Sequence, residues 1–259
     1  MRIWFVGVNL AWSEYRRSGV AILEGGPDRP LAYVRSGTYR LVPEIAAPIL
    51  ELDGPVWVAI DGPVVVRNQA GGRPVDVALA QRYARFDVGA HAANLNQLKD
   101  NPRGENLVEL LAARGVRQMH RVVLPPKADG SWAFETFSHP AMMELFGLDR
   151  IIHYKKGSVQ TKREGVRTVA GLLTEHLPRL DPPLALSDDL AALLGRDPLA
   201  MRGRGLQAHE DQLDALLGAY VAAHVWHWSA ERNWHLGSAE TGSTVLPMIR
   251  PDVDHSPAP

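Results

Sequence analysis

The feature that most constrains the fold is a continuous apolar run, Val56–Ile60, which ends in one carboxylate, Asp61, and then in Gly62-Pro63. An apolar run of this length is typical of a buried strand, and a Gly-Pro pair ends it. Asp61 is therefore expected at the carboxyl end of a core strand, the edge where open α/β sheets hold their ligands. The carboxylate there is either a catalytic or metal-binding group, or a cap for the following turn.

The segments before this strand predict a mixed α/β fold. Ile3–Leu10, Gly19–Glu24 and Leu31–Tyr39 are β-rich and have short connections, which predicts an antiparallel meander. A short helix over Pro43–Leu52 separates the meander from the Asp61 strand. A crossover of this kind places the next strand parallel to a neighbour in the sheet.

The remainder of the chain is expected to be mainly helical. Helices are predicted over 77–98 with a break near 87–89, over 105–114, 140–146 and 163–176, near Leu190, and over 209–228. Short strands are predicted over 122–124, 131–136 and 244–249. We expect a single domain over residues 1–250, with helices on both faces of the sheet and helical insertions. The Pro-, Asp- and Ser-rich residues 251–259 are expected to form a disordered tail.

Composition excludes several classes of protein. The chain has 259 residues, of which 46% are apolar, a formal net charge of -1 and no cysteine. The absence of cysteine excludes disulfides, thiolate metal sites and cysteine nucleophiles. The near-neutral charge provides no global basic field for binding nucleic acid. No apolar run reaches the roughly 18 residues of a membrane span, and no signal-peptide pattern is present, so a soluble cytoplasmic protein is expected.

A second group of acids lies in the predicted last helix, within the sequence His209-Glu210-Asp211-Gln212-Leu213-Asp214. Asp211 and Asp214 are three residues apart and share a helix face. Acids in the first turn of a helix are favoured by its dipole and as caps, which is one interpretation of Asp211. Asp214 lies a turn further in, among leucines, where a carboxylate is costly unless it is paired or binds a metal.

Glu135 is a third candidate, since it lies among aromatic residues near the end of a predicted strand. An exposed strand position is an equal alternative for this residue. Together Asp61, Glu135, Asp211 and Asp214 come from the ends of separate elements. Carboxylates without cysteine suit a hard cation such as Mg²⁺ or Mn²⁺. Two such ions can activate water and stabilise the leaving oxygen in phosphodiester cleavage.

Five short motifs carry a resemblance to a known family. In order along the chain they are Gly7–Trp12, Ala59–Pro63, Glu135 with His139-Pro140, Tyr154-Lys155, and Asp211–Ala215. In this order and spacing, over roughly residues 3–250, the chain resembles the family known as domain of unknown function 429, described as predicted nucleases of ribonuclease-H-like fold. The resemblance implies three antiparallel strands followed by parallel strands. It also implies metal ions shared by a first-strand acid, Asp61, Glu135 and an acid of the last helix.

The chain departs from this pattern at Asn9, where the first strand of the family usually has Asp. Asn offers one neutral oxygen, so a bridging role would be lost and metal affinity should fall, unless another acid such as Glu14 compensates. The leading hypothesis is a Mg²⁺- or Mn²⁺-dependent nuclease. Its metal ligands would be Asn9, Asp61, Glu135 and Asp214, with Asp211 also in the catalytic group and Lys155 on the substrate phosphate.

Two alternatives stay open. A non-catalytic module on the same fold could bind nucleic acid, a nucleotide or a protein, and Asn9 favours this reading. A phosphotransferase of the related actin-like fold would share the strand-end acids, but the chain has no paired Gly-rich phosphate loops. The basic residues over 150–167 are either a phosphate contact or a solvated face, and His224 and His227 are either metal ligands or packing residues.

Overall fold

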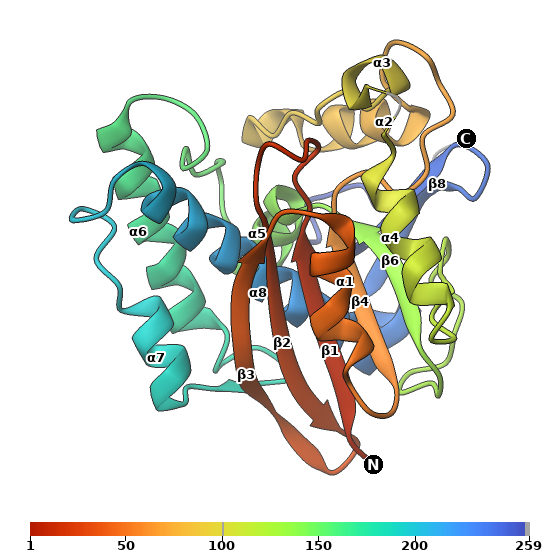
Figure 1. Cartoon of the computed structure of the whole chain (residues 1–259), viewed down its shortest axis with the longest axis horizontal. Helices are drawn as coiled ribbons and strands as arrows, with labels where there is room; N and C mark the ends of the chain where they lie inside the picture. Colours follow the sequence, from red (N-terminus) through yellow and green to blue (C-terminus); the bar gives the residue numbers. More distant parts are fainter. Residues whose placement is uncertain (100, 257–259) are drawn as a thin grey trace.

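The computed structural model describes residues 1–99 and 101–256 of the chain (Figure 1). Within these residues seven strands form one sheet in the order β5-β6-β4-β1-β2-β3-β7, and β8 and β9 form a separate hairpin. The strands are β1 (Ile3–Asn9), β2 (Ser18–Gly26), β3 (Arg29–Tyr39), β4 (Val56–Asp61), β5 (Arg117–Gln118), β6 (Trp132–Thr136), β7 (Leu184–Ala185), β8 (Asn233–Ser238) and β9 (Gly242–Pro247).

Strand directions confirm the predicted mixed sheet. β1, β2 and β3 form the antiparallel meander, whereas β4 and β6 continue the sheet parallel to β1 on its other side. The short edge strands β5 and β7 are parallel to β6 and β3 respectively. The crossover from β3 through helix α1 to β4 therefore places Asp61 beside the end of β1, as the apolar run and the preceding helix predict.

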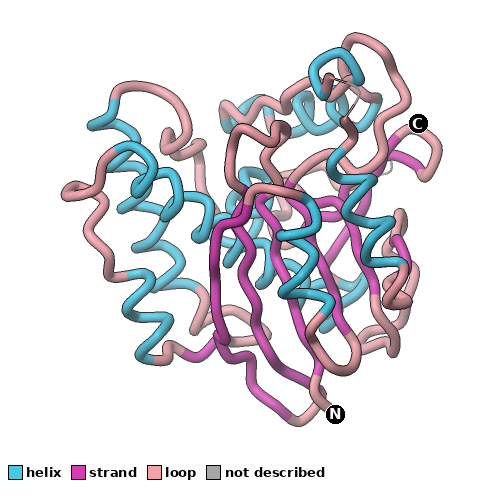
Figure 2. The backbone as a smooth tube through the Cα atoms, in the orientation of Figure 1, coloured by secondary structure: helices cyan, strands magenta, loops and turns pink. Residues whose placement is uncertain are grey.

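Helices cover both faces of the sheet (Figure 2). They are α1 (Val42–Leu50), α2 (Pro74–Arg82), α3 (Leu95–Leu98), α4 (Arg103–Ala112), α5 (Ser138–Phe146), α6 (Val159–His176), α7 (Asp188–Leu194) and α8 (Gly203–Trp228). Alternate strand residues supply two separate apolar cores. Val6 and Val58 face the layer that contains α1 and α4, while Phe5 and Trp57 face the layer that contains α8.

Helix α8 lies directly on the backbone of the central strands. A Cβ atom added to Gly7 of β1 would lie 1.9 Å from the carbonyl oxygen of Ala215, and one added to Gly19 of β2 would lie 1.9 Å from that of Asp211. Only glycine, which has no Cβ, permits so close an approach. The two glycines therefore determine how far α8 can sink onto the sheet.

Several local predictions are wrong. The break predicted near 87–89 is present, since Asp87 has a positive φ of 62°, but the helix does not resume after it. Only the short α3 forms before residue 98, and Asn94 caps its start by accepting a hydrogen bond from the Gln97 N–H. The predicted strand over 122–124 is absent, and the edge strand β5 forms earlier. Strand β8 is not among the sequence predictions. Helix α8 begins at Gly203 rather than at 209.

The end of the chain contacts the body of the protein. Val253 is buried, and the Arg85 guanidinium donates a hydrogen bond to the Asp252 backbone. The His255 ring lies 3.0 Å from a carboxylate oxygen of buried Glu144. The predicted disorder therefore does not describe residues 251–256, whereas residues 257–259 lie outside the described part of the chain. Among the described helices, none has the length and apolar character needed to cross a bilayer.

We expect Gly7→Val to lower the free energy of unfolding by about 2 kcal/mol or more, because its side chain would overlap the α8 backbone. Urea denaturation followed by circular dichroism measures this change. Gly171→Ala is the matched control, since a Cβ at this position of α6 meets no atom within 4 Å. This substitution should stabilise the helix by roughly 0.5–1 kcal/mol. Equal effects of the two variants would contradict the packing described for α8.

Candidate acidic site

The carboxyl ends of β1, β4 and β6 bring three polar side chains into one row. Asn9 is the register partner of Asp61, and Asp61 is the partner of Thr136. Register partners in a sheet point to the same face. All three follow the alternation that places Phe5 and Trp57 toward α8, so the row lies under that helix.

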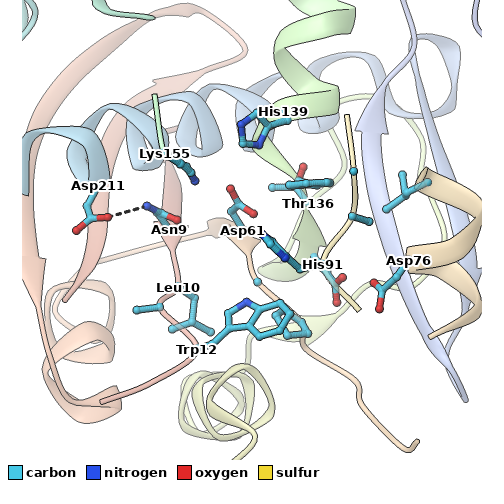
Figure 3. A pocket seen from close by; sticks show the side chains of 18 of the residues that line it. Asn9, Leu10, Trp12, Asp61, Asp76, His91, Thr136, His139, Lys155 and Asp211 are labelled. Carbon is cyan, nitrogen blue, oxygen red and sulfur yellow. Dashed lines mark hydrogen bonds between the residues drawn. The ribbon is translucent and has the colours of Figure 1, made fainter. Parts of the chain in front are cut away.

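Helix α8 adds Asp211 and Asp214 to this row. The side-chain amide of Asn9 donates hydrogen bonds to Asp211 Oδ1 at 3.1 Å and to Asp214 Oδ2 at 3.3 Å. Figure 3 marks the first of these bonds. The prediction that the two acids share a helix face is therefore confirmed. Both lie about two turns or more inside α8, so helix-start capping does not explain either of them.

Asp214 is held by a buried charge pair. Its side chain is 1% exposed, and its Oδ2 lies 2.7 Å from the Lys155 ammonium, while its Oδ1 accepts a 2.8 Å hydrogen bond from the Tyr154 hydroxyl. Burial lowers the pKa of the Lys155 amine, but attraction by Asp214 and Asp61 outweighs burial and raises that pKa overall. Lys155, expected on a substrate phosphate, is thus bound to an acid of the site.

Asp61 lies between strand β4 and the start of helix α5. Its Oδ2 accepts hydrogen bonds from the Ser138 hydroxyl and from the Ser138 N–H, the latter at 3.3 Å. Burial raises the pKa of the Asp61 carboxyl, and Asp214 adds to this rise, whereas Lys155 opposes it. Asp61 therefore lies within reach of the charges of Lys155 and Asp214, and it also accepts hydrogen bonds from Ser138, the first residue of α5.

Glu135 has a different role from the one its sequence position suggested. It is 7% exposed and makes hydrogen bonds of 2.9 and 2.6 Å with the buried Arg73 guanidinium. It also accepts from the Val64 N–H at 2.8 Å and from the Thr244 hydroxyl at 3.2 Å. Because strand side chains alternate, Thr136 and not Glu135 points along the row with Asp61. Glu135 is thus a neutralised partner of Arg73, and it joins no carboxylate of that row.

A cavity of about 840 Å³ opens over the row. Its volume lies in the range typical of small-molecule sites. Its walls include acidic, basic and aromatic side chains from strands, helices and loops far apart in sequence: Asn9, Trp12, Arg16, Arg17, Asp61, Arg73, His91, Glu135, Thr136, Phe137, His139, Lys155, Lys156, Glu210 and Asp211. The predicted candidates other than Asp214 therefore border one cavity, and Asp214 lies buried directly behind Asn9 and Lys155.

Two acids of this cavity hold protons near neutral pH. Burial, together with the charges of Asp214 and Glu210, raises the pKa of Asp211 to about 8. Burial, with Asp214 again adding, raises the pKa of Glu210 to about 7. The Oδ2 atom of Asp211 is buried and has no hydrogen-bond partner in the structure. An unpaired buried carboxyl oxygen is costly, so this atom is suited to binding a ligand or a solvent molecule.

Metal-ligand geometry is not preformed in the described residues. Across residues 1–99 and 101–256, no group of three or more His, Asp or Glu side chains is arranged to hold a metal ion. The Lys155 ammonium supplies the positive charge beside Asp214 instead. Glu14, the possible substitute for an acid at position 9, accepts a hydrogen bond from Asn101. His224 is buried and hydrogen-bonded to Asn233 at 2.7 Å, which supports the packing interpretation of that histidine.

Sequence reasoning missed several groups that hold the site together. Ser138 directly precedes His139, which belongs to a recognised motif, so sequence adjacency could have identified it. Tyr154 belongs to the motif Tyr154-Lys155, but its hydrogen bond to Asp214 was not predicted. Arg73 and Asp76 begin α2, and the spacing of three residues fits their ion pair at 2.7 Å. The contact of Arg73 with Glu135 joins segments 62 residues apart, and no local pattern predicts it.

We expect Glu135→Gln to lower the free energy of unfolding by about 3 kcal/mol, because the buried Arg73 guanidinium would keep only Asp76 as a charged partner. Thermal or urea denaturation measures the loss. Glu105→Gln, which breaks the partly exposed pair with Arg67 at 2.6 Å, is the matched control and should cost less than about 1 kcal/mol. A Glu135→Gln variant as stable as the parent would contradict the structural role.

The raised pKa of Asp211 predicts a pH-dependent effect of Asp211→Asn. Since the folded protein keeps a proton that the unfolded chain releases between about pH 3.8 and pH 8, the unfolding free energy falls as pH rises through this window. Asn cannot ionise, so the variant should gain stability over the parent as pH rises, on the order of 2 kcal/mol by pH 8. Urea denaturation at pH 5 and pH 8 measures it. A difference that does not grow with pH would show that Asp211 ionises normally.

Comparison with known proteins agrees with the motif order. The family described as Protein of unknown function (DUF429) matches residues 14–235, which is most of the chain. Neither the curated proteins nor the solved structures contain a significant match. The matched region includes Asp61, Lys155 and both acids of α8, and Asn9 lies just before it. The chain therefore belongs to the DUF429 family of proteins.

Proposed function

We propose that this protein is a divalent-cation-dependent phosphodiesterase that cleaves nucleic acid, with a ribonuclease-H-like fold. The observation that carries the proposal is the convergence of Asn9, Asp61, Asp211 and Asp214, from two parallel strands and a distant helix, beside one cavity. The seven-stranded mixed sheet, with its meander first and its parallel strands after, is consistent with that fold.

The donor chemistry of the site fits Mg²⁺ or Mn²⁺. Carboxylate and amide oxygens from Asp61, Asp211 and Asn9 are hard ligands of the kind these ions prefer. The unpartnered Oδ2 of Asp211 supports this assignment, since the atom is buried and has no hydrogen bond to lose. The Lys155 side chain is 31% exposed, so it has room to withdraw from Asp214 when a cation enters.

A bound cation would lower the pKa of a water molecule and stabilise the leaving oxygen. The chain itself supplies orientation. The raised pKa of Asp211 means that this carboxyl would release its proton when a cation binds to it, since a carboxylate binds a metal ion in its deprotonated form. Ser138 and Tyr154 keep Asp61 and Asp214 in place through their hydroxyl groups. Preorganised groups of this kind act without a cost of reorientation during the reaction.

The opening of the cavity suits an anionic substrate. Arg16, Arg17 and Lys156 lie along its walls with Lys155. Arg16 takes part in no ion pair within the described residues, so it is available to a phosphate group. The overall charge of the chain is near zero, and attraction of a nucleic acid would therefore come from this local group.

A non-catalytic binding module on the same fold is the second candidate. The ion pair between Lys155 and Asp214 favours the binding module, because the charge of Asp214 is already neutralised without a metal ion. Asn9 favours it as well, since its amide nitrogen, and not a carboxylate, faces both acids of α8. Such a module would hold its nucleic acid, nucleotide or protein ligand in the same cavity.

We expect Asp61→Asn to reduce cleavage of nucleic acid by at least about a hundredfold, because it removes the carboxylate at the centre of the row formed by Asn9, Asp61 and Thr136. Cleavage of labelled single-stranded and duplex oligonucleotides with Mg²⁺ or Mn²⁺ measures the loss. Asp149→Asn is the control, since the Asp149 side chain is 97% exposed and should not matter. Cleavage by Asp61→Asn at the parent rate would refute the assignment.

Calorimetric titration separates the two candidates. The parent should bind Mn²⁺ at millimolar concentrations or better, and Asp61→Asn should bind it more weakly, because the ligand charge falls by one. A parent that binds an oligonucleotide but neither Mn²⁺ nor Mg²⁺ would instead favour the binding module.

A further inference from the structure

One part of the cavity wall is aromatic, and the proposed chemistry does not use it. Trp12 lies in the loop after β1, and His91 lies in the segment between α2 and α3. Their ring centroids are 6.1 Å apart with an interplanar angle of 77°, an edge-to-face contact. In Figure 3 the two rings lie next to each other, on the side of Asp61 away from Lys155. Both side chains border the cavity.

The Trp12 ring is supported from behind. It packs against a small apolar cluster made of Val66, Ala93 and Leu98, which is separate from the two main cores. The indole remains only partly buried and lines the cavity together with Leu10. A flat side chain that packs against apolar residues and also borders a cavity can receive a planar ligand at little entropic cost.

This wall is formed by the indole of Trp12 and the imidazole of His91. Burial, followed by the charges of Lys156 and Lys155, lowers the pKa of His91, which favours the uncharged form of its ring. The cationic groups lie elsewhere on the cavity, at Arg16, Lys155 and Lys156. A ligand that fills the cavity would therefore meet a flat uncharged wall and, beside it, groups that attract a phosphate.

Nucleotides have this division between an uncharged planar ring and an anionic phosphate. We propose that Trp12, beside His91, is a stacking site for an unpaired nucleobase, and that single-stranded nucleic acid is the substrate class. Bases inside a duplex are stacked on their neighbours and cannot reach such a wall, whereas every base of a single strand can stack on an aromatic ring. The inference rests on the proposed function for the identity of the polymer.

Fluorescence anisotropy of a labelled oligonucleotide tests the site with the full-length chain, in EDTA so that cleavage is suppressed. The probes are a single-stranded oligonucleotide, an abasic strand of the same length and a duplex. The protein variants are Trp12→Leu, which keeps apolar packing but removes the flat ring, and Trp12→Phe, which keeps a smaller ring. Trp228→Leu is the matched control, because Trp228 is also partly buried but does not border the cavity.

The parent should bind the single strand more tightly than the abasic strand or the duplex. Trp12→Leu should weaken binding of the single strand by roughly 5- to 100-fold and leave binding of the abasic strand unchanged. Trp12→Phe should lie in between, and Trp228→Leu should match the parent. Circular dichroism confirms that each variant is folded.

Three results would overturn the inference: equal losses for the single and abasic strands, no loss in Trp12→Leu, or a parent that binds none of the probes. Failure of the proposed function is a separate result. In that case the cleavage assay would detect no cleavage, or the same cleavage by the parent and Asp61→Asn. Binding in EDTA would still depend on the bases of the strand and on Trp12.

Discussion

The close contact between helix α8 and the central strands is the constraint on which the site depends. Gly7 and Gly19 lack the side chains that would hold the helix away, and so the α8 backbone rests on β1 and β2. Only at this separation can the short side chain of Asn9 reach Asp211 and Asp214 together. The distance between Asn9 and the acids of α8 therefore depends on two residues that have no side chain.

Electrostatics at the site are balanced by very few groups. The charge of Asp214 raises the pKa values of Asp61, Asp211 and Glu210, and Lys155 is the cation that most opposes this rise. Protonation of Asp211 and Glu210 relieves the repulsion that a single ammonium cannot cancel. Any ligand that brings or removes a charge will therefore change which of these acids hold protons.

Much of the fold follows from local patterns, whereas the detail of the site does not. The apolar run before Asp61, the β-rich meander and the shared face of Asp211 and Asp214 all depend on neighbours in sequence, and the structure confirms each of them. The alternative that Glu135 is an exposed strand residue is wrong, because Glu135 is buried against Arg73. Its segment does not show which strand face it occupies, and Arg73 lies 62 residues away. The predicted start of α8 was too late, because the low helix propensity of Gly203 and Gly205 argues against a helix that tertiary packing stabilises.

The ion pair of Glu135 and Arg73 is also connected, through Asp76, to the segment that contains His91. Arg73 is paired with Asp76, and Asp76 in turn accepts a 3.0 Å hydrogen bond from the Ala93 N–H, two residues after His91. A chain of buried polar contacts thus runs from the central sheet to the segment that carries one side of the cavity. Loss of a buried charge at Glu135 would therefore be felt, through Arg73 and Asp76, in the backbone next to His91.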